Sequence, residues 1–126
     1  MTTPTYKINV SAESFYVPEQ SDEDGSRYFF AYTIRIANSG SIAAQLISRH
    51  WIITDSNERV QEVRGQGVVG EQPRIEPGEV FEYTSSATLE TAVGTMRGSY
   101  QMLAEDGTKF EAAIPEFTLS IPRVLH

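Results

Sequence analysis

The sequence predicts an all-β protein, folded as a β-sandwich of two antiparallel sheets. Apolar residues recur at every second position over most of the chain, which is the period of a strand with one buried face. Clusters of Gly, Pro, Asp, Asn and Ser separate these runs at intervals typical of a sandwich. We find no helical period over any stretch long enough to form a helix. About seven or eight strands are therefore expected.

The two N-terminal runs supply one face of the predicted core. Apolar alternation begins at Tyr6 and continues to Ala12, after which the apolar positions move by one residue to Phe15 and Val17. Such a shift is typical of a β-bulge or of a strand that changes sheets. The next run is the clearest in the chain, and its predicted core positions are Tyr28, Phe30, Tyr32, Ile34 and Ile36.

Residues 45–54 form the third predicted strand, which is apolar on both sides. In a regular strand Ile47 and Trp51 share one face and Leu46 lies on the other, so we expect this strand to be covered on both faces. Arg49 falls on the same side as Trp51. We expect the arginine to stack or to form an ion pair at the margin of the core, with its charged end near water.

Three further runs complete the predicted sheets. Alternation returns at residues 81–89, at 96–104 and at 110–121, with a tight hairpin at Asp106-Gly107 between the last two. The last run changes phase at Pro115. Proline cannot donate to a β-ladder, so Pro115 predicts a bulge or an edge strand at this point.

A glycine-rich segment at residues 65–70 matches the dinucleotide-binding pattern G-x-G-x-x-G. That pattern holds a pyrophosphate where it opens a helix, and Pro73 argues against a helix here. Two interpretations stay open. The segment serves turn geometry, with Gly67 at positive φ, or its backbone N–H groups bind a small anion with help from neighbouring arginines. The candidate residues of this anion-binding or interaction loop are Arg64, Gly65, Gly67, Gly70 and Arg74.

Composition narrows the classes of function. The chain has 126 residues, a net charge of −7 and no cysteine, which excludes disulfides, thiolate metal sites and cysteine nucleophiles. An acidic surface disfavours nucleic acid, no apolar run is long enough to span a membrane, and a cytoplasmic location is expected. The two histidines, His50 and His126, belong to no catalytic or metal-binding motif. We therefore expect no catalytic residue, no metal site and no cofactor.

Several separated motifs of the chain resemble the ApaG family. The similarity spans about residues 5–126 and is carried by residues 27–32, 49–54, 62–73, 77–79, 83–85 and 94–102, with Pro115 and Phe117 near the end. The resemblance implies an immunoglobulin-like or fibronectin-III-like β-sandwich. It also implies one ApaG domain over residues 1–126, with an ordered core of about residues 5–122, since chain ends are usually tails.

The same resemblance favours a non-enzymatic binding module for another protein, because related domains occur fused to F-box and polymerase-interacting proteins. It carries a family-level link to cobalt and magnesium efflux and resistance. An unidentified protein partner is expected, and exposed edge strands make a weak homodimer a further expectation. Arg97 joins the candidate interaction residues because arginine is enriched at binding hot spots. The alternative function is binding of a small anion, a pyrophosphate or a nucleotide by the loop at residues 65–70.

Overall fold

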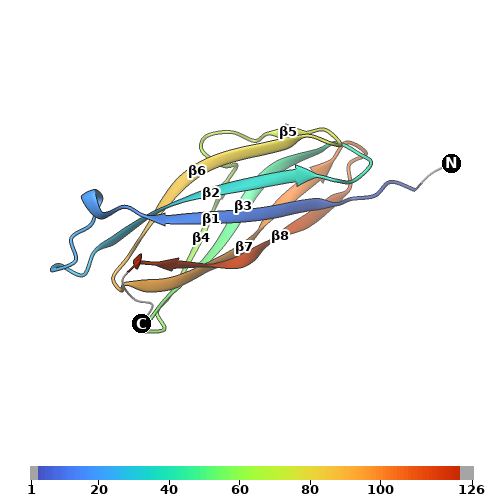
Figure 1. Cartoon of the computed structure of the whole chain (residues 1–126). Helices are drawn as coiled ribbons and strands as arrows, with labels where there is room; N and C mark the ends of the chain where they lie inside the picture. Colours follow the sequence, from blue (N-terminus) through green and yellow to red (C-terminus); the bar gives the residue numbers. More distant parts are fainter. Residues whose placement is uncertain (1–2, 123–126) are drawn as a thin grey trace.

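A computed structural model describes residues 3–122 of the chain. Within these residues the protein forms eight β-strands and one short 3-10 helix (Figure 1). The elements in chain order are β1 (Ile8–Tyr16), η1 (Pro18–Gln20), β2 (Tyr28–Asn38), β3 (Ala44–Asp55), β4 (Val60–Gln66), β5 (Arg74–Ile75), β6 (Val80–Leu89), β7 (Val93–Ala104) and β8 (Lys109–Ser120).

The strands form two antiparallel sheets, as the sequence predicts. The first sheet has the strand order β1-β2-β6, and the second has the order β4-β3-β7-β8, with β5 also paired to β3. Every pairing among these strands is antiparallel. The inner faces of the two sheets pack against each other, which gives the all-β sandwich expected from the alternation.

The core lies between the sheets and is rich in aromatic residues. Phe30, Ile34 and Ile36 of β2 are fully buried and Tyr32 is 5% exposed, which confirms four of the predicted core positions. The fifth, Tyr28, is only partly buried and packs against the core. Trp51 of β3 lies at the centre, with its ring 5.5 Å from that of Tyr32 and 6.0 Å from that of Phe117. The contacts of Tyr32 with Trp51 and with Phe117, whose ring lies 5.9 Å away, join the two sheets.

The phase shift predicted in the first strand is wrong. β1 pairs with β2 in one continuous register as far as Tyr16, so Ser14 and Tyr16 keep the inward phase of Val10, and Phe15 is 44% exposed. A polar residue is tolerated at the inward position because the Ser14 hydroxyl donates to the Thr118 carbonyl at 2.7 Å. The Tyr16 ring packs against Phe30, which explains why no bulge is needed.

Two bulges do occur, one of them predicted. The pairing of β7 with β8 changes register between Met96 and Gly98, opposite Pro115, which confirms the bulge expected at that proline. A second register shift lies between Leu46 and Ser48 of β3. It turns the fully buried Leu46 to the inner face, together with Trp51, so the prediction that these two side chains lie on opposite faces is wrong.

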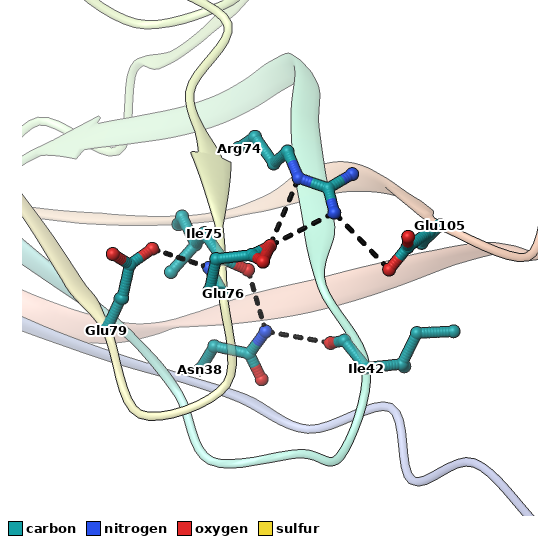
Figure 2. Close-up of polar contacts among 7 residues, drawn as sticks. All are labelled: Asn38, Ile42, Arg74, Ile75, Glu76, Glu79 and Glu105. Atoms are coloured by element: carbon teal, nitrogen blue, oxygen red, sulfur yellow. Dashed lines mark hydrogen bonds and ion pairs between the residues drawn. The ribbon is translucent and has the colours of Figure 1, made fainter.

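A buried asparagine fixes the connections at one end of the sandwich. Asn38 is 2% exposed, and its side-chain nitrogen donates to the carbonyl oxygens of Ile42 and Ile75, both at 2.9 Å (Figure 2). Its side-chain oxygen accepts a hydrogen bond from the Gly40 amide. The side chain thereby ties β2 to the loop that follows it and to β5, so its burial carries no unsatisfied polar group.

Candidate functional site

A groove runs along the side of the sandwich where β6, the edge of the first sheet, faces β4, the edge of the second. Three hollows of about 310, 380 and 600 Å³ follow one another there. Neighbouring hollows share lining residues, so they form one continuous depression, here called the edge groove. Its middle part is lined by Tyr32, Arg49, Trp51, Ile53, Gln61, Val63, Ser85, Ser86, Ala87, Thr88 and Met96.

The floor of the edge groove carries tyrosine hydroxyls. The Tyr83 and Tyr100 hydroxyl oxygens are 2.5 Å apart and share a hydrogen bond. Burial raises the pKa of both tyrosines and also raises the pKa of Tyr32, an effect that the nearby Ser85 hydroxyl and the Arg49 charge only partly offset. These hydroxyls therefore stay protonated at neutral pH. Tyr32 and Tyr83 line the groove, and Tyr100 is fully buried beneath it.

Arg49 is the cation in the middle of the edge groove, whereas Arg27 and Arg59 line its 600 Å³ end. The Arg49 Nη1 donates to the carbonyl oxygens of Gln66 and Gly67, at 2.9 and 2.8 Å. The guanidinium lies against Gly65, where a Cβ atom would come within 2.8 Å of the Arg49 Cζ. Arg49 thus lies at the margin of the core as predicted. Backbone carbonyls hold it, and no carboxylate of residues 3–122 forms an ion pair with it.

The glycine motif is half strand and half turn. Gly65 lies within β4, opposite Arg49, and the turn begins at Gly67, whose φ of +62° confirms the predicted positive value. The amides of Gly67, Val68 and Glu71 already donate to backbone carbonyls. As the sequence indicates, β5 rather than a helix follows the motif. The turn therefore holds Arg49 by its carbonyls, and three of its N–H groups are not free for an anion.

Arg64 and Arg97, two of the predicted site arginines, do not lie beside the glycine turn. Arg64 is paired with His50 and Arg97 with Ile52, positions that alternate with Trp51 and so face outward. The outward-facing Arg64 lies 3.8 Å from a Glu62 carboxylate oxygen. The structure thus places Arg64 and Arg97 on the outer face of the second sheet, away from the edge groove.

Arg74 is also engaged elsewhere. Its guanidinium lies 3.1 Å from a carboxylate oxygen of Glu76 and 3.3 Å from one of Glu105 (Figure 2). Arg74 pairs in register with Gln45, next to the buried Ile75, so it too faces outward. The cation that contacts the glycine turn is Arg49, which the sequence analysis did not count among the site residues. The available signal was an arginine two positions before a tryptophan, on the same face of the predicted strand.

His50 lies on the outer face of β3 and not in the edge groove. Its Nε2 atom is buried without a hydrogen-bond partner and lies 3.5 Å from a Glu62 carboxylate oxygen. Across residues 3–122, no group of three or more His, Cys, Asp and Glu side chains is arranged to hold a metal ion. In the same part of the chain no helix is long and apolar enough to cross a membrane. His126 lies outside the described residues.

A family model described as the ApaG domain matches residues 18–104. The chain belongs to the ApaG family. Curated relatives named Protein ApaG include one from Thiobacillus denitrificans, 65% identical over 96% of this chain and 95% of that protein. Another, from Dechloromonas aromatica, is 62% identical over 98% of both chains. The family expected from the sequence motifs is thus confirmed.

Solved structures of similar proteins have the same fold. A crystal structure described as an ApaA protein from Bordetella pertussis has a TM-score of 0.91 and 60% identity, covering 94% of this chain and 96% of that one. A protein from Archaeoglobus fulgidus with 11% identity has a TM-score of 0.51 and covers 91% of this chain and 98% of that one. The second likeness concerns the fold alone.

Proposed function

We propose that this ApaG-family protein is a non-enzymatic, cytoplasmic binding module whose ligand is another protein, bound along the edge groove. The observation that carries the proposal is the free edge of β6 beside that groove. From residue 83 to residue 89 the strand has no charged residue and no proline, and it pairs with β2 without a bulge. Such an unprotected edge presents free N–H and C=O groups to an added strand.

The edge formed by β8 shows how a protected strand differs. It carries Lys109, Glu111 and Glu116, and its ladder is interrupted by the bulge at Pro115. Charge, proline and bulges are the usual means of preventing unwanted strand pairing. Their presence on β8 and their absence from residues 83–89 of β6 support a partner site on the β6 side.

The chemistry of the edge groove suits binding better than catalysis. Its ionisable side chains near the centre are Arg49, a permanent cation, and tyrosines whose pKa burial raises. A general base poised near neutral pH would need a different environment. His50 lies on the opposite face of β3, so the strand itself separates it from this groove.

We propose that the family-level link with cobalt and magnesium efflux acts through a protein partner. On this proposal the chain itself binds neither ion stoichiometrically. Isothermal calorimetry should give no cobalt or magnesium affinity tighter than about 10 µM, near −7 kcal/mol. Stoichiometric binding of either ion with a dissociation constant below about 10 µM would instead favour direct metal binding.

Site-specific photo-crosslinking tests the protein-binding proposal directly. A photoreactive amino acid replaces Ser86 on β6 or, as the matched control, Ala113 on β8; both positions are exposed. Irradiated cells should yield a protein adduct at position 86 and none at position 113. Adducts at neither position, or at position 113 alone, would show that the β6 side is not the partner surface.

Binding of a small anion remains the second candidate, and a specific observation favours it. Arg49 lies in the groove without a carboxylate partner among residues 3–122. Arg49 acting alone at the middle of the groove, in a protein of net charge −7, is a weak receptor for pyrophosphate or ATP. We expect dissociation constants above about 1 mM, near −4 kcal/mol. Saturable NMR shifts at micromolar pyrophosphate would promote this candidate over the first.

A further inference from the structure

Arg49 has hydrogen-bonding capacity left over. Its Nη1 is used by the two carbonyls of the glycine turn, whereas no bond is formed by Nε or Nη2 with any of residues 3–122. Over the same residues His50 Nε2 is the unpartnered side-chain atom that is fully buried. The free Arg49 donors therefore touch solvent in the edge groove. A guanidinium edge matches the planar oxygens of a carboxylate, which is the oxyanion that unmodified protein side chains carry.

The position of Arg49 along the groove indicates what kind of carboxylate fits. The 310 Å³ and 380 Å³ hollows share Tyr32, Arg49, Trp51 and Ser85. The groove continues from this shared point in both directions, towards Val69 on one side and Thr88 on the other. A terminal carboxylate bound to Arg49 would leave the groove on one side of the arginine empty. An extended segment that runs along the groove, with an acidic side chain at Arg49, fills the groove on both sides of the arginine.

The edge of β6 aligns such a segment. Inward residues of β6 alternate, and Ser85 is the one beside Arg49. A strand added to this edge presents every second side chain to the same groove. One of those side chains then lies over the Arg49 guanidinium. Backbone pairing supplies affinity, and the pocket around Arg49 supplies specificity.

A second copy of this chain does not meet the requirement. If two β6 strands paired edge to edge, the side chains turned into the grooves would be those of Phe81, Tyr83, Ser85, Ala87 and Leu89, and none carries a charge. Arg49 would stay without a carboxylate in such a dimer. A β6–β6 dimer therefore leaves the free donors of Arg49 unpaired, which favours an acidic segment of a different protein as the occupant.

We propose that the edge groove receives an extended acidic segment of a partner protein, which pairs with β6 and places one Asp or Glu side chain on Arg49. This proposal rests on the proposed function and narrows it to a class of ligand. The net charge of −7 opposes acidic ligands at long range. The preference for a carboxylate is therefore local, and it falls on one position of the segment.

Peptide selection followed by calorimetry tests the proposal. A library of random octapeptides, displayed within a longer chain so that neither end is free, is selected against the intact protein. Recovered sequences should share Asp or Glu at one position. Each is then synthesised with blocked ends, beside a version in which Gln replaces that acid. The acidic version should bind at least about tenfold more tightly, because a charge-assisted bond is lost in the other.

Variants of the protein locate the effect. Ser85→Glu supplies a carboxylate beside Arg49 from the chain itself, and it should abolish the tenfold preference without removing the Arg49 bonds to the turn. Thr84→Glu is the matched control, because it adds the same charge on the outer face of β6. Its preference should stay within about twofold of the original. Arg49→Gln should also abolish the preference, provided that its thermal unfolding stays cooperative.

Three results would overturn the acidic-segment proposal: no selected peptide, peptides without a shared acid, or an equal loss in Ser85→Glu and Thr84→Glu. Each of them leaves the protein-binding proposal standing if the crosslink at position 86 still forms. If no crosslink forms at position 86 but acidic peptides still bind, the assignment of a protein partner in cells is refuted. The assignment of the groove as a binding site for acidic segments then stands.

Discussion

The two sides of the sandwich are built differently. On one side, the closed side, β1 and β8 run side by side (Figure 1), and polar bonds there join β1, and the residues just before it, to β8 and the turn that precedes it. The Ser14 hydroxyl donates to the Thr118 carbonyl at 2.7 Å, and the Tyr6 hydroxyl donates to an Asp106 carboxylate oxygen at 2.6 Å. On the open side, β6 and β4 stand apart, and the edge groove exposes Arg49 between them.

The difference separates stability from binding. Residues of the closed side bond with one another, so they leave little for a ligand. On the open side the backbone of the glycine turn holds Arg49 by one nitrogen, while the rest of the guanidinium and the edge of β6 stay free. We expect substitutions on the closed side to change the free energy of unfolding, and substitutions at the free groups of the open side to change binding.

Phe30→Ala should have the largest effect on stability, because both sides depend on the core that this fully buried side chain fills. Removing the ring leaves a cavity and should cost about 3–5 kcal/mol. Urea unfolding followed by Trp51 fluorescence measures the loss. A cost below about 1 kcal/mol would mean that the two sheets are not packed tightly at this point.

Gly67→Ala should come next, as a test of how the open side is shaped. At φ +62° an added Cβ would lie 2.2 Å from the Glu71 carbonyl oxygen, so both backbone strain and a backbone clash arise. The cost should be at least about 1 kcal/mol. Gly70→Ala is the matched control, since its φ is +80° and nothing lies within 4 Å of the added atom. Equal losses in the two variants would show that the clash is relieved by movement of the turn.

Much of this architecture could be predicted from the sequence, because the period of two identifies inner faces without reference to the partner strand. Proline likewise marked the bulge on β8. The bulge in β3 could not be found, since Ile47 carries no glycine or proline signal. The phase of β1 was mispredicted because the bond that satisfies Ser14 comes from Thr118, far along the chain.

The site was predicted only in part for a related reason. The glycine motif was recognised, but its arginine partner depends on the register of β3 against β4. That register sets Gly65 opposite Arg49 and turns Arg64 to the outer face. A shift of one residue exchanges the two faces, and nothing local in the sequence fixes it.

A matched pair of serines compares the two sides directly. Ser14→Ala removes a hydrogen bond that crosses between the sheets on the closed side and should cost about 0.5–1.5 kcal/mol. Ser86→Ala alters an exposed hydroxyl on the open side and should stay within about 0.5 kcal/mol of the original protein. Thermal unfolding of both variants decides the point. A larger loss in Ser86→Ala would reverse the proposed division between the sides.

The smallest expected effect is a pH dependence on the closed side. The hydrogen bond from the Tyr6 hydroxyl lowers the pKa of the Asp106 carboxyl, and bonds from Thr108 add to it. Because the pKa of Asp106 is lower in the folded state, the bond stabilises the fold at pH values above the ordinary aspartate pKa. This stabilisation is lost as the pH falls through the pKa that Asp106 has in the folded protein. Tyr6→Phe should therefore be less stable at neutral pH, by an amount that shrinks towards about pH 2. A difference that is the same at both pH values would exclude this carboxylate as its source.

The most direct test of the account is a map of where a ligand binds. Isotope-labelled protein is titrated with a selected acidic octapeptide, and amide and guanidinium NMR shifts are followed. We predict saturable shifts in β6, in residues 65–70 and at the Arg49 Nε–H, with β1 and β8 unchanged. Shifts centred on β1 and β8, or on the outer face of the second sheet around Arg64 and Arg97, would contradict the claim that the open side is the binding surface.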